Sequence, residues 1–183
     1  MALLNTISGY QPLLALTDSP VDPTGPPDDR SGTSYVATGE LLLATEVALA
    51  TGRPLLLRGA PGSGKSSWAS YVARNLGWRY HESVVTANTE LSDFYYRFDA
   101  VRRLQDAQRG KSGGDLEPFR YLTPGPLWLG FNWSDALDLL KRQQRSVAIL
   151  PHGKLNQNRD AERAVVLIDE LDKADSSLPN GLL

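Results

Sequence analysis

One glycine-rich loop constrains the fold of this chain more than any other feature. Residues 59–66 read Gly-Ala-Pro-Gly-Ser-Gly-Lys-Ser, which fits the pattern G-x-x-x-x-G-K-[ST]. The loop follows the unbroken apolar run 55–57 and precedes a segment of helical pattern that ends at Gly77. Such apolar runs are typical of parallel strands buried on both faces. A strand, this loop and a helix in that order predict an α/β domain with a site for nucleotide phosphates.

The residue types of the loop fit the needs of a phosphate group. Gly59, Gly62 and Gly64 permit the tight curve that turns successive backbone N–H groups toward an anion. The following helix, which begins near Lys65, adds the positive end of its dipole. We expect Lys65 to reach the β- and γ-phosphates and the Ser66 hydroxyl to ligate Mg²⁺. The predicted nucleotide-binding residues are Gly59, Ala60, Pro61, Gly62, Ser63, Gly64, Lys65, Ser66 and Ser67.

Two carboxylates follow a second apolar run much later in the chain. Asp169 and Glu170 come directly after residues 164–168, and α/β sheets place their ligands at the carboxyl ends of such strands. We expect Asp169 to hold the Mg²⁺ shell through water and Glu170 to polarise the attacking water. Each motif has an alternative interpretation. Residues 59–66 could form an ordinary glycine-rich turn, and Asp169 and Glu170 could be ordinary solvated residues at a strand end. The presence of both motifs in one chain favours the nucleotide site.

Composition and charge exclude several other classes of protein. The 183 residues suffice for one domain, and a net charge of −2 lacks the basic footprint of a nucleic-acid binder. The absence of cysteine excludes disulfides and thiolate metal sites. The apolar runs are shorter than the ~20 residues of a membrane-spanning helix, and the N-terminus lacks the basic start of a secretory signal. We therefore expect a cytoplasmic protein without membrane or nucleic-acid partners.

Residues 1–33 are predicted to form a flexible arm and linker in front of the folded domain. Within them, residues 18–32 hold four prolines, two glycines and four aspartates. A stretch of this composition cannot bury enough apolar area to offset the entropy lost on ordering. The domain is therefore predicted to cover residues 34–183.

Periodicity and turn residues predict strands separated by helices in this domain. Helices are expected at 38–52, 65–76, 89–109 and 134–145, and strands at 54–58, 78–85, 119–122 and 164–168. Loops or turns are expected at 110–118, 123–126 and 151–163. Phe98, Val101 and Leu104 supply the apolar stripe of the third helix, with Leu91 and Phe94 as further candidates. The pattern predicts a P-loop three-layer α/β sandwich, with helices on both faces of a mostly parallel sheet.

In these motifs the chain resembles the AAA+ ATPases. Residues 53–66, Arg-Pro-Leu-Leu-Leu-Arg-Gly-Ala-Pro-Gly-Ser-Gly-Lys-Ser, and residues 165–175, Val-Val-Leu-Ile-Asp-Glu-Leu-Asp-Lys-Ala-Asp, are similar to the two nucleotide motifs of that family. More narrowly they resemble its MoxR-type branch, also called dynein-related AAA domains. Residues 98–104 and 121–128 are similar to the insert region of that branch. The resemblance covers the chain from about residue 35 to its end.

The resemblance implies an ATP-driven, ring-forming machine that remodels proteins. Such rings are usually homo-oligomeric hexamers, often acting with partners that contain a von Willebrand factor A domain. The prediction that the nucleotide is ATP and not GTP rests on the resemblance. The run Asn-Lys-x-Asp, which recognises guanine, is absent from the sequence. Tyr35 and Val36 would border the adenine or, alternatively, pack the start of the domain. Residues 121–128 would face a substrate or pore, or form a turn that packs Trp128 into the core.

The family's domain continues beyond the point where this sequence ends. After the acidic strand it has a sensor strand, an arginine finger and a helical lid, none of which is recognised before Leu183. We therefore expect a domain truncated after the second nucleotide motif, the Walker B motif. An arginine finger raises the rate by roughly 10³–10⁵-fold in related NTPases. These residues alone should therefore bind nucleotide better than they hydrolyse it.

Two other functions stay open on the sequence. A P-loop small-molecule kinase would share the phosphate loop, although such kinases rarely place a glutamate directly after the strand-end aspartate. A nucleotide-binding module without turnover would fit a domain that lacks its arginine finger. Away from the motifs, Trp68 is expected in the core, and the isolated His81 and His152 are expected to be structural residues.

Overall fold

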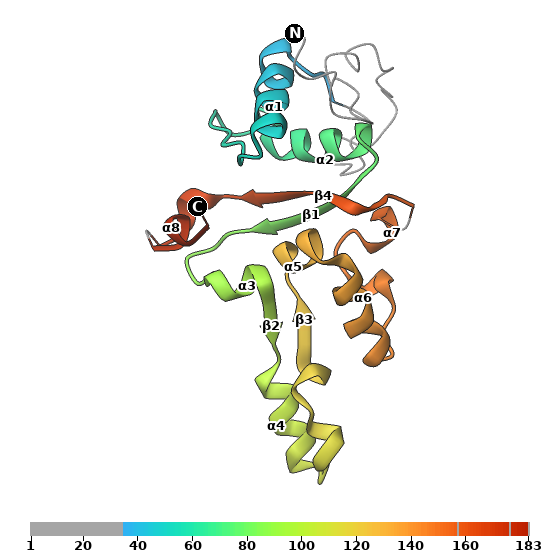
Figure 1. Ribbon diagram of the computed structural model, residues 1–183. Coiled ribbons are helices and arrows are strands. Elements are labelled where there is room, and N and C mark those ends of the chain that lie inside the picture. The colour runs from blue at the N-terminus through green and yellow to red at the C-terminus, as the bar shows by residue number, and fades with distance from the viewer. Residues whose placement is uncertain (1–34, 157, 176, 183) are drawn as a thin grey trace. The chain divides into compact units, whose positions relative to one another are not determined.

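The structure is a computed structural model of the chain (Figure 1) and describes residues 35–156, 158–175 and 177–182. The chain divides into two compact units, Met1–Trp78 and Arg79–Leu183, and each is described by itself. The predicted arm, residues 1–33, lies outside the described residues and stays a prediction.

Among the described residues of the first unit there are two helices, α1 (Gly39–Thr51) and α2 (Lys65–Asn75). The Thr38 hydroxyl accepts a hydrogen bond from the backbone N–H of Leu41 (3.5 Å). Gly52 ends α1 in the left-handed region, at φ 65°. A threonine before a helix and a glycine after it are common end signals. The first two predicted helices and these end residues are confirmed.

A buried tryptophan joins α2 to α1. The Trp68 indole N–H donates to the Thr45 hydroxyl (3.0 Å), which in turn donates to the backbone oxygen of Leu41 (2.8 Å). Trp68 is 2% exposed. The indole thus satisfies its one donor inside the core, as a buried tryptophan requires. The predicted core position of Trp68 is confirmed.

The prediction of a strand at 54–58 is wrong. Residues 53–60 have no regular secondary structure, and the Leu56 side chain is 66% exposed. A strand is stable only where a neighbour pairs with its backbone N–H and C=O groups. Among the described residues no strand pairs with this segment, so the apolar run forms no ladder.

Strands β1 (Trp78–Val84) and β4 (Asp160–Asp169) pair with each other in one sheet. Both arrows point the same way in Figure 1, so the sheet is parallel, as expected for strands linked through helices. The backbone N–H of Val85 donates to the Asp169 oxygen (2.9 Å), which extends the pairing to both strand ends. These two predicted strands are confirmed, although β4 begins before residue 164 and its apolar half is only partly buried.

The main core of the second unit lies where two helices pack on β4. These helices are α5 (Pro126–Phe131) and α6 (Trp133–Arg142). The buried cluster between them consists of Leu129, Ala136, Leu140 and Leu150. Trp128 is partly buried and packs against this cluster. Trp128 thus lies at the edge of the core and not fully inside it, and the predicted turn 123–126 is replaced by the end of a strand and the start of α5.

A second cluster braces the carboxyl ends of β1 and β4. Val85, Phe94 and Leu178 form it, and Ile168 packs against them. Phe94 belongs to the short helix α3 (Leu91–Tyr95), and Leu178 to α8 (Ser177–Leu182). Because Ile168 directly precedes Asp169, this packing positions the end of β4.

The predicted loop 151–163 contains the short helix α7 (Gly153–Asn156) and the start of β4. The Asn156 side-chain amide accepts a hydrogen bond from the Tyr80 N–H (2.8 Å) and donates to the Tyr80 oxygen (2.9 Å). One buried amide thus pairs with the β1 backbone as a neighbouring strand would. The sequence did not predict this contact, because Asn156 and Tyr80 lie far apart along the chain.

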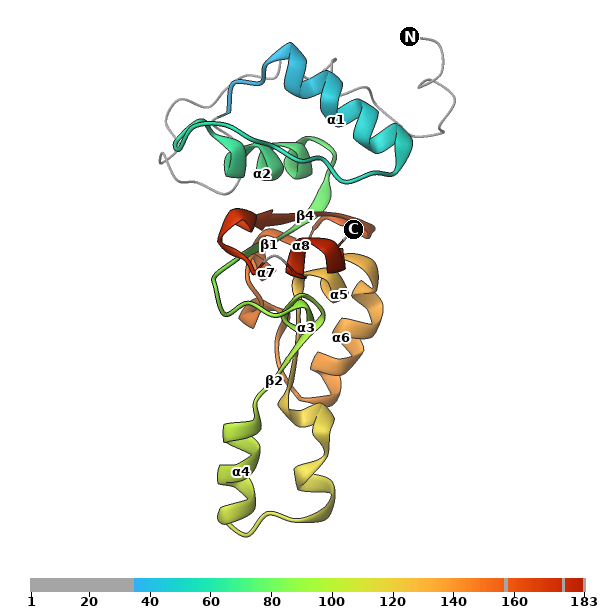
Figure 2. The ribbon, with the colours of Figure 1, turned by 90° about the vertical axis from the view of Figure 1, so that its left-hand side faces the viewer.

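An antiparallel hairpin interrupts the predicted helix 89–109. Strand β2 (Tyr96–Phe98) pairs with β3 (Leu122–Pro124). Helix α4 (Ala100–Gln108) follows β2, and two 3-10 turns, Gly113–Leu116 and Pro118–Tyr121, lead back to β3. Figure 2 shows this segment extending from α3 to α4 and back. We call residues 96–124 the insert. The predicted strand 119–122 is therefore mostly a 3-10 turn, and the strand itself lies at Leu122–Pro124. The predicted loop 110–118 contains the other 3-10 turn.

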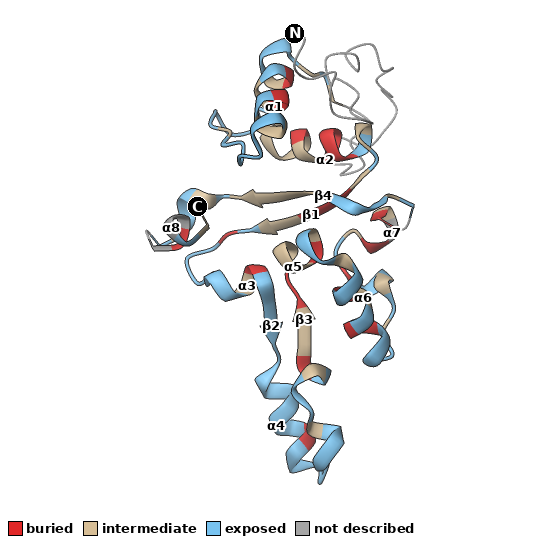
Figure 3. Ribbon diagram, viewed as in Figure 1, coloured by how far each residue is buried: buried red, intermediate tan, exposed pale blue. Residues whose placement is uncertain are grey.

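Of the predicted apolar stripe of this segment, Phe94 is buried, but the three residues beyond it do not form a core. Phe98, Val101 and Leu104 are 41%, 67% and 60% exposed, and the buried residue of α4 is Asp106 (Figure 3). The Asp106 carboxylate accepts a hydrogen bond from the Tyr121 hydroxyl (3.0 Å). Helix α4 therefore packs with a polar side on the rest of the insert, and tertiary contacts override its amphipathic pattern.

Gly125 lies where the insert returns to α5, against the backbone of α3. A Cβ atom there would lie 2.5 Å from the Phe94 oxygen and 2.6 Å from the Asp93 oxygen. The Gly125 N–H donates to the Tyr95 oxygen (2.8 Å), which holds the two segments at this distance. We expect Gly125→Ala to lower the free energy of unfolding in urea by about 2 kcal/mol.

Gly114→Ala is the matched control, because a Cβ at Gly114 would meet no atom within 4 Å. Its effect should stay within about 0.5 kcal/mol. A Gly125→Ala protein as stable as the Gly114→Ala protein would contradict the close approach of α3.

The guanidinium group of Arg79 ties β1 to its neighbours. Arg79 is 1% exposed and donates to the backbone oxygens of Asp160 (3.0 Å), Ala161 (3.0 Å) and Leu129 (2.6 Å). Its central carbon also lies 4.6 Å from the centre of the Trp133 ring. The buried charge is thus compensated by carbonyl dipoles and an aromatic face, as a buried cation requires.

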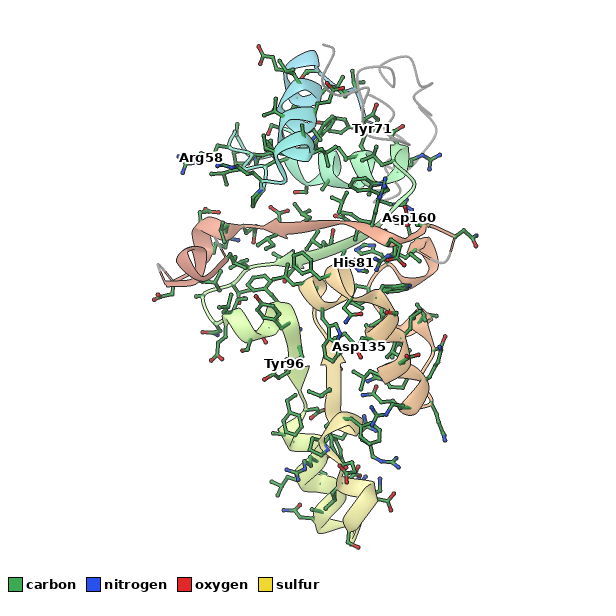
Figure 4. All side chains as sticks on the ribbon, viewed as in Figure 1. Arg58, Tyr71, His81, Tyr96, Asp135 and Asp160 are labelled. Atoms are coloured by element: carbon green, nitrogen blue, oxygen red, sulfur yellow. The ribbon has the colours of Figure 1, made fainter. Side chains whose placement is uncertain are left out.

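His81 is the second buried ionisable residue of β1, on the side of the sheet toward α5 (Figure 4). It is 2% exposed, and its Nε2 has no hydrogen-bond partner in the described chain. Its burial, and to a smaller extent Arg79 and His152, lower the pKa of His81 to about 3. A neutral, packed His81 agrees with the predicted structural role.

The free energy of unfolding is expected to fall with decreasing pH because of His81. Its pKa in the unfolded chain is the ordinary 6.5, well above the folded value of about 3. Between these values the unfolded chain binds the extra proton, so stability is lost as the pH falls below 6.5. Urea unfolding at pH 7 and pH 4.5 should show that wild type loses about 2 kcal/mol more than His81→Gln. Equal losses in the two proteins would contradict a neutral His81.

Candidate functional site

The loop 59–66 leads directly into α2 with the backbone angles of an anion-binding turn. Gly62 and Gly64 have φ values of 75° and 83°, which favour glycine over residues with a Cβ. Gly64 is the cap residue of α2, and among the described residues no side-chain cap is recorded at this helix end. The first N–H groups of a helix have no acceptor within the helix, and they lie at the positive end of its dipole. The start of α2 therefore has the geometry that an anion site needs.

The Lys65 ammonium lies against the loop that precedes it. Its Nζ donates to the backbone oxygens of Gly59 (3.0 Å) and Ala60 (2.8 Å) and lies 3.5 Å from the Ser63 hydroxyl. These acceptors are neutral, whereas a phosphate oxygen is charged and binds an ammonium roughly twice as strongly. Lys65 is therefore placed to exchange the loop oxygens for those of a phosphate.

The other predicted phosphate-binding residues lie in the same loop and helix start. Ala60 and Pro61 are exposed, while Ser66 and Ser67 are partly buried in the first turn of α2. The backbone N–H of Trp68 donates to the Gly64 oxygen (3.0 Å), which begins the helical hydrogen-bonding pattern. The nine predicted residues thus lie in the loop and the first turn of α2.

An aromatic cluster adjoins this loop. The Tyr35 ring lies 5.4 Å from Trp68 and 5.5 Å from Tyr71, and the latter two rings stack at 5.3 Å. A Cβ at Gly64 would lie 2.9 Å from the Tyr35 ring. Burial raises the pKa of Tyr35, so its hydroxyl stays neutral. Tyr35 therefore packs against the loop and α2. The sequence does not specify this packing, because it depends on residues that only the fold brings together. The contact of Tyr35 with adenine stays a prediction.

Asp169 and Glu170 lie at the carboxyl end of β4, as predicted. Asp169 is the last residue of the strand, and Glu170 follows with φ 59° and ψ 35°. This left-handed conformation is uncommon for glutamate, and residues held in such conformations cluster at functional sites. The Glu170 N–H donates to Asp169 Oδ1 (2.9 Å). The turn leaves Asp169 partly buried and Glu170 exposed.

Lys173 engages the carboxylate of Glu170. Its Nζ lies 2.7 Å from Glu170 Oε2, because the 3-10 turn Leu171–Lys173 places side chains three apart on one face. The hydrogen bond to Glu170, together with the charges of nearby carboxylates, raises the pKa of Lys173. The sequence motifs single out Glu170 but not Lys173, so this contact was not predicted. The available signal was the spacing of three residues between Glu170 and Lys173.

The predicted site residues fall into two groups. The loop and the start of α2 belong to the first unit, and Asp169 and Glu170 belong to the second. In the described part of the chain, no three acidic or histidine side chains cluster to hold a metal ion by themselves. A Mg²⁺ ion bound with nucleotide takes most of its ligands from phosphate and water. Ser66 and Asp169 stay predictions as protein contacts to such an ion.

The helices give no sign of a membrane span. No helix in the described part of the chain is both long enough and apolar enough to cross a bilayer.

Comparison with protein families identifies the group to which the chain is related. A family model for the AAA domain, dynein-related subfamily, matches residues 54–183, which is most of the chain. The match includes the glycine-rich loop, Asp169 and Glu170. Neither the comparison with curated proteins nor that with solved structures gives a match. On the family match, the glycine-rich start of α2 and the acidic end of β4, the chain belongs to the dynein-related subfamily of AAA domains, a family of nucleotide-binding ATPase modules.

Proposed function

We propose that the chain binds ATP with Mg²⁺ at residues 59–67 and hydrolyses it as part of an AAA+ assembly. The observation that carries this proposal is the N-terminus of α2, where the cap residue Gly64 has no side chain and Lys65 folds over the preceding loop. Backbone donors at a helix start, together with a nearby ammonium, recognise phosphate. Membership of the AAA family supports ATP as the nucleotide.

The chain's own residues would divide binding and hydrolysis between them. Backbone N–H groups of the loop surround the phosphates, and Lys65 contacts the β- and γ-phosphate oxygens. Ser66 directly and Asp169 through water would hold Mg²⁺, which would supply positive charge to the phosphate oxygens. Glu170 orients the attacking water and accepts its proton. The left-handed turn at Glu170, which presents the carboxylate at the strand end, supports this role.

The narrower resemblance extends the proposal to the work that ATP drives. Similarity of residues 98–104 and 121–128 to the MoxR-type insert favours remodelling of a protein partner. The domain at 34–183 would act in a homo-oligomeric ring, a hexamer in most relatives of this type, in the cytoplasm. A protein with a von Willebrand factor A domain is the proposed partner class. In such a ring, a neighbouring subunit supplies the arginine finger.

Isothermal titration of the purified chain with Mg-ATP tests the proposal. We expect saturable binding of one ATP per chain, weaker binding of Mg-GTP, and weaker binding of ATP when EDTA removes Mg²⁺. Circular dichroism on the same sample establishes that the protein is folded. A folded sample that shows no saturable binding of Mg-ATP would overturn the proposal.

A further inference from the structure

A polar cavity of about 220 Å³ lies between the insert and the end of α6. Its charged lining residues are Arg102, Asp106, Lys111, Asp115, Arg120 and Arg145. None of them belongs to the loop 59–66 or to the end of β4. A space of this size holds several water molecules, so a small polar ligand can replace them.

The walls of this cavity carry more positive than negative charge. Four cationic and two carboxylate side chains give a net charge of +2. Asp106, 6% exposed, already accepts a hydrogen bond from the Tyr121 hydroxyl (3.0 Å) and pairs with Lys111 (3.0 Å). The hydrogen bond from Lys111, above all, lowers the pKa of Asp106, so that carboxylate is ionised. The excess of positive charge therefore remains after Asp106 is counted.

Asp115 compensates little of the remaining charge. It is exposed, and its carboxylate lies 3.9 Å from the Arg120 guanidinium, at the long limit of an ion pair. Exposed pairs of this kind are screened by water and contribute little.

Arg102 and Arg145 keep hydrogen-bond donors available for a ligand. The Arg102 guanidinium lies 5.6 Å from the centre of the Tyr121 ring, and no described carboxylate lies within ion-pair distance of it. Arg145 Nη1 makes a long contact (3.4 Å) with Gln143 Oε1. The Gln143 amide donates to the backbone oxygens of Phe119 and Leu122, which fixes its position. Planar guanidinium donors of this kind match the oxygens of phosphate and carboxylate.

We propose that this cavity binds a phosphate dianion, either free or carried by a phosphorylated ligand. One phosphate group carries a charge of about −1.5 to −2 near neutral pH and so neutralises the walls. One carboxylate would leave about half of the excess charge uncompensated. Arg102 and Arg145 donate to the phosphate oxygens from two elements, and Lys111 and Arg120 supply the surrounding positive potential. This site goes beyond the proposed nucleotide function and does not depend on it.

Titration of the full chain with inorganic phosphate at pH 8 tests the proposal. The protein carries Lys65→Ala, so that the loop 59–66 cannot supply the signal. We expect saturable binding of phosphate that Arg102→Gln and Arg145→Gln each weaken about tenfold, as for loss of one charged hydrogen bond. Lys141→Gln is the matched control, because Lys141 is exposed, pairs with Asp138 (3.0 Å) and does not line the cavity. Its phosphate affinity should equal that of the parent.

Two further ligands separate the sources of the phosphate group. A short peptide with one phosphoserine that binds more tightly than inorganic phosphate would assign the site to a phosphorylated side chain. Equal affinities would assign it to free phosphate or a small phosphate ester. The unphosphorylated peptide should not bind. The absence of saturable phosphate binding, or binding that neither arginine substitution weakens in folded protein, would overturn the proposal.

Discussion

Lys65→Ala is expected to weaken the binding of Mg-ATP by about 100-fold. The Lys65 ammonium would contact oxygens of two phosphates, and each charged hydrogen bond contributes about 1.5–3 kcal/mol. In the structure Nζ donates to the neutral oxygens of Gly59 (3.0 Å) and Ala60 (2.8 Å), which water can solvate after the substitution. The loss should therefore appear in nucleotide affinity and hardly in stability. Isothermal titration with Mg-ATP and thermal unfolding of the same samples measure the two quantities.

Arg53→Ala is the matched control for this experiment. Arg53 is an exposed cation in the same unit, and it lies outside the glycine-rich loop. Its removal changes the net charge equally but should leave the affinity for Mg-ATP within about twofold. Equal affinity losses in the two proteins would mean that general charge, and not the loop, holds the nucleotide. Unchanged affinity in Lys65→Ala would place the nucleotide site elsewhere.

Glu170→Gln is expected to lower the rate of ATP hydrolysis by at least about 100-fold and to leave ATP affinity nearly unchanged. Glutamine has the shape of glutamate but cannot accept the proton of the attacking water, a step that contributes about 10²–10⁴-fold. The side-chain oxygen can still accept the hydrogen bond from Lys173 (2.7 Å), so the turn should keep its conformation. Phosphate release under single-turnover conditions and ATP titration measure the two effects.

Asp172→Asn serves as the control, since Asp172 is an exposed carboxylate in the same turn. It should hydrolyse ATP at a rate within about twofold of wild type. Undiminished hydrolysis by Glu170→Gln would remove Glu170 from the mechanism. Phosphoryl transfer to an added small-molecule acceptor, unaffected by this substitution, would favour the kinase alternative. Tight ATP binding without phosphate release by wild type, even with partner subunits present, would favour a binding module without turnover.

The candidate site could be located from sequence because its features are local. The glycines of the loop, Lys65 and the start of α2 lie within a few residues of one another, and the structure places them as that spacing requires. Asp169 and Glu170 follow an apolar run, and the structure places them at the end of β4. The contact of Lys173 with Glu170 was missed because it depends on a single 3-10 turn, which periodicity does not reveal.

Packing of the insert could not be predicted in the same way. The pattern of Phe98, Val101 and Leu104 predicted an inward apolar stripe, yet these side chains are exposed and Asp106 is buried. The side of α4 that packs is decided by the Tyr121 hydroxyl and Lys111, which reach Asp106 from the returning turns. An amphipathic pattern predicts a face that is suited to burial, but it does not supply the partner.

The sequence by itself determined the α/β class, the ends of α1 and α2, the phosphate loop and the acidic strand end. Caps, glycine backbone angles and strand ends arise from interactions within a few residues, so the sequence pattern contains them. Only the tertiary structure decided that 54–58 forms no strand, that β2 interrupts a helix and that α4 packs by its polar side. Strand pairing and burial need partners far along the chain, and no local pattern specifies which partner is in place.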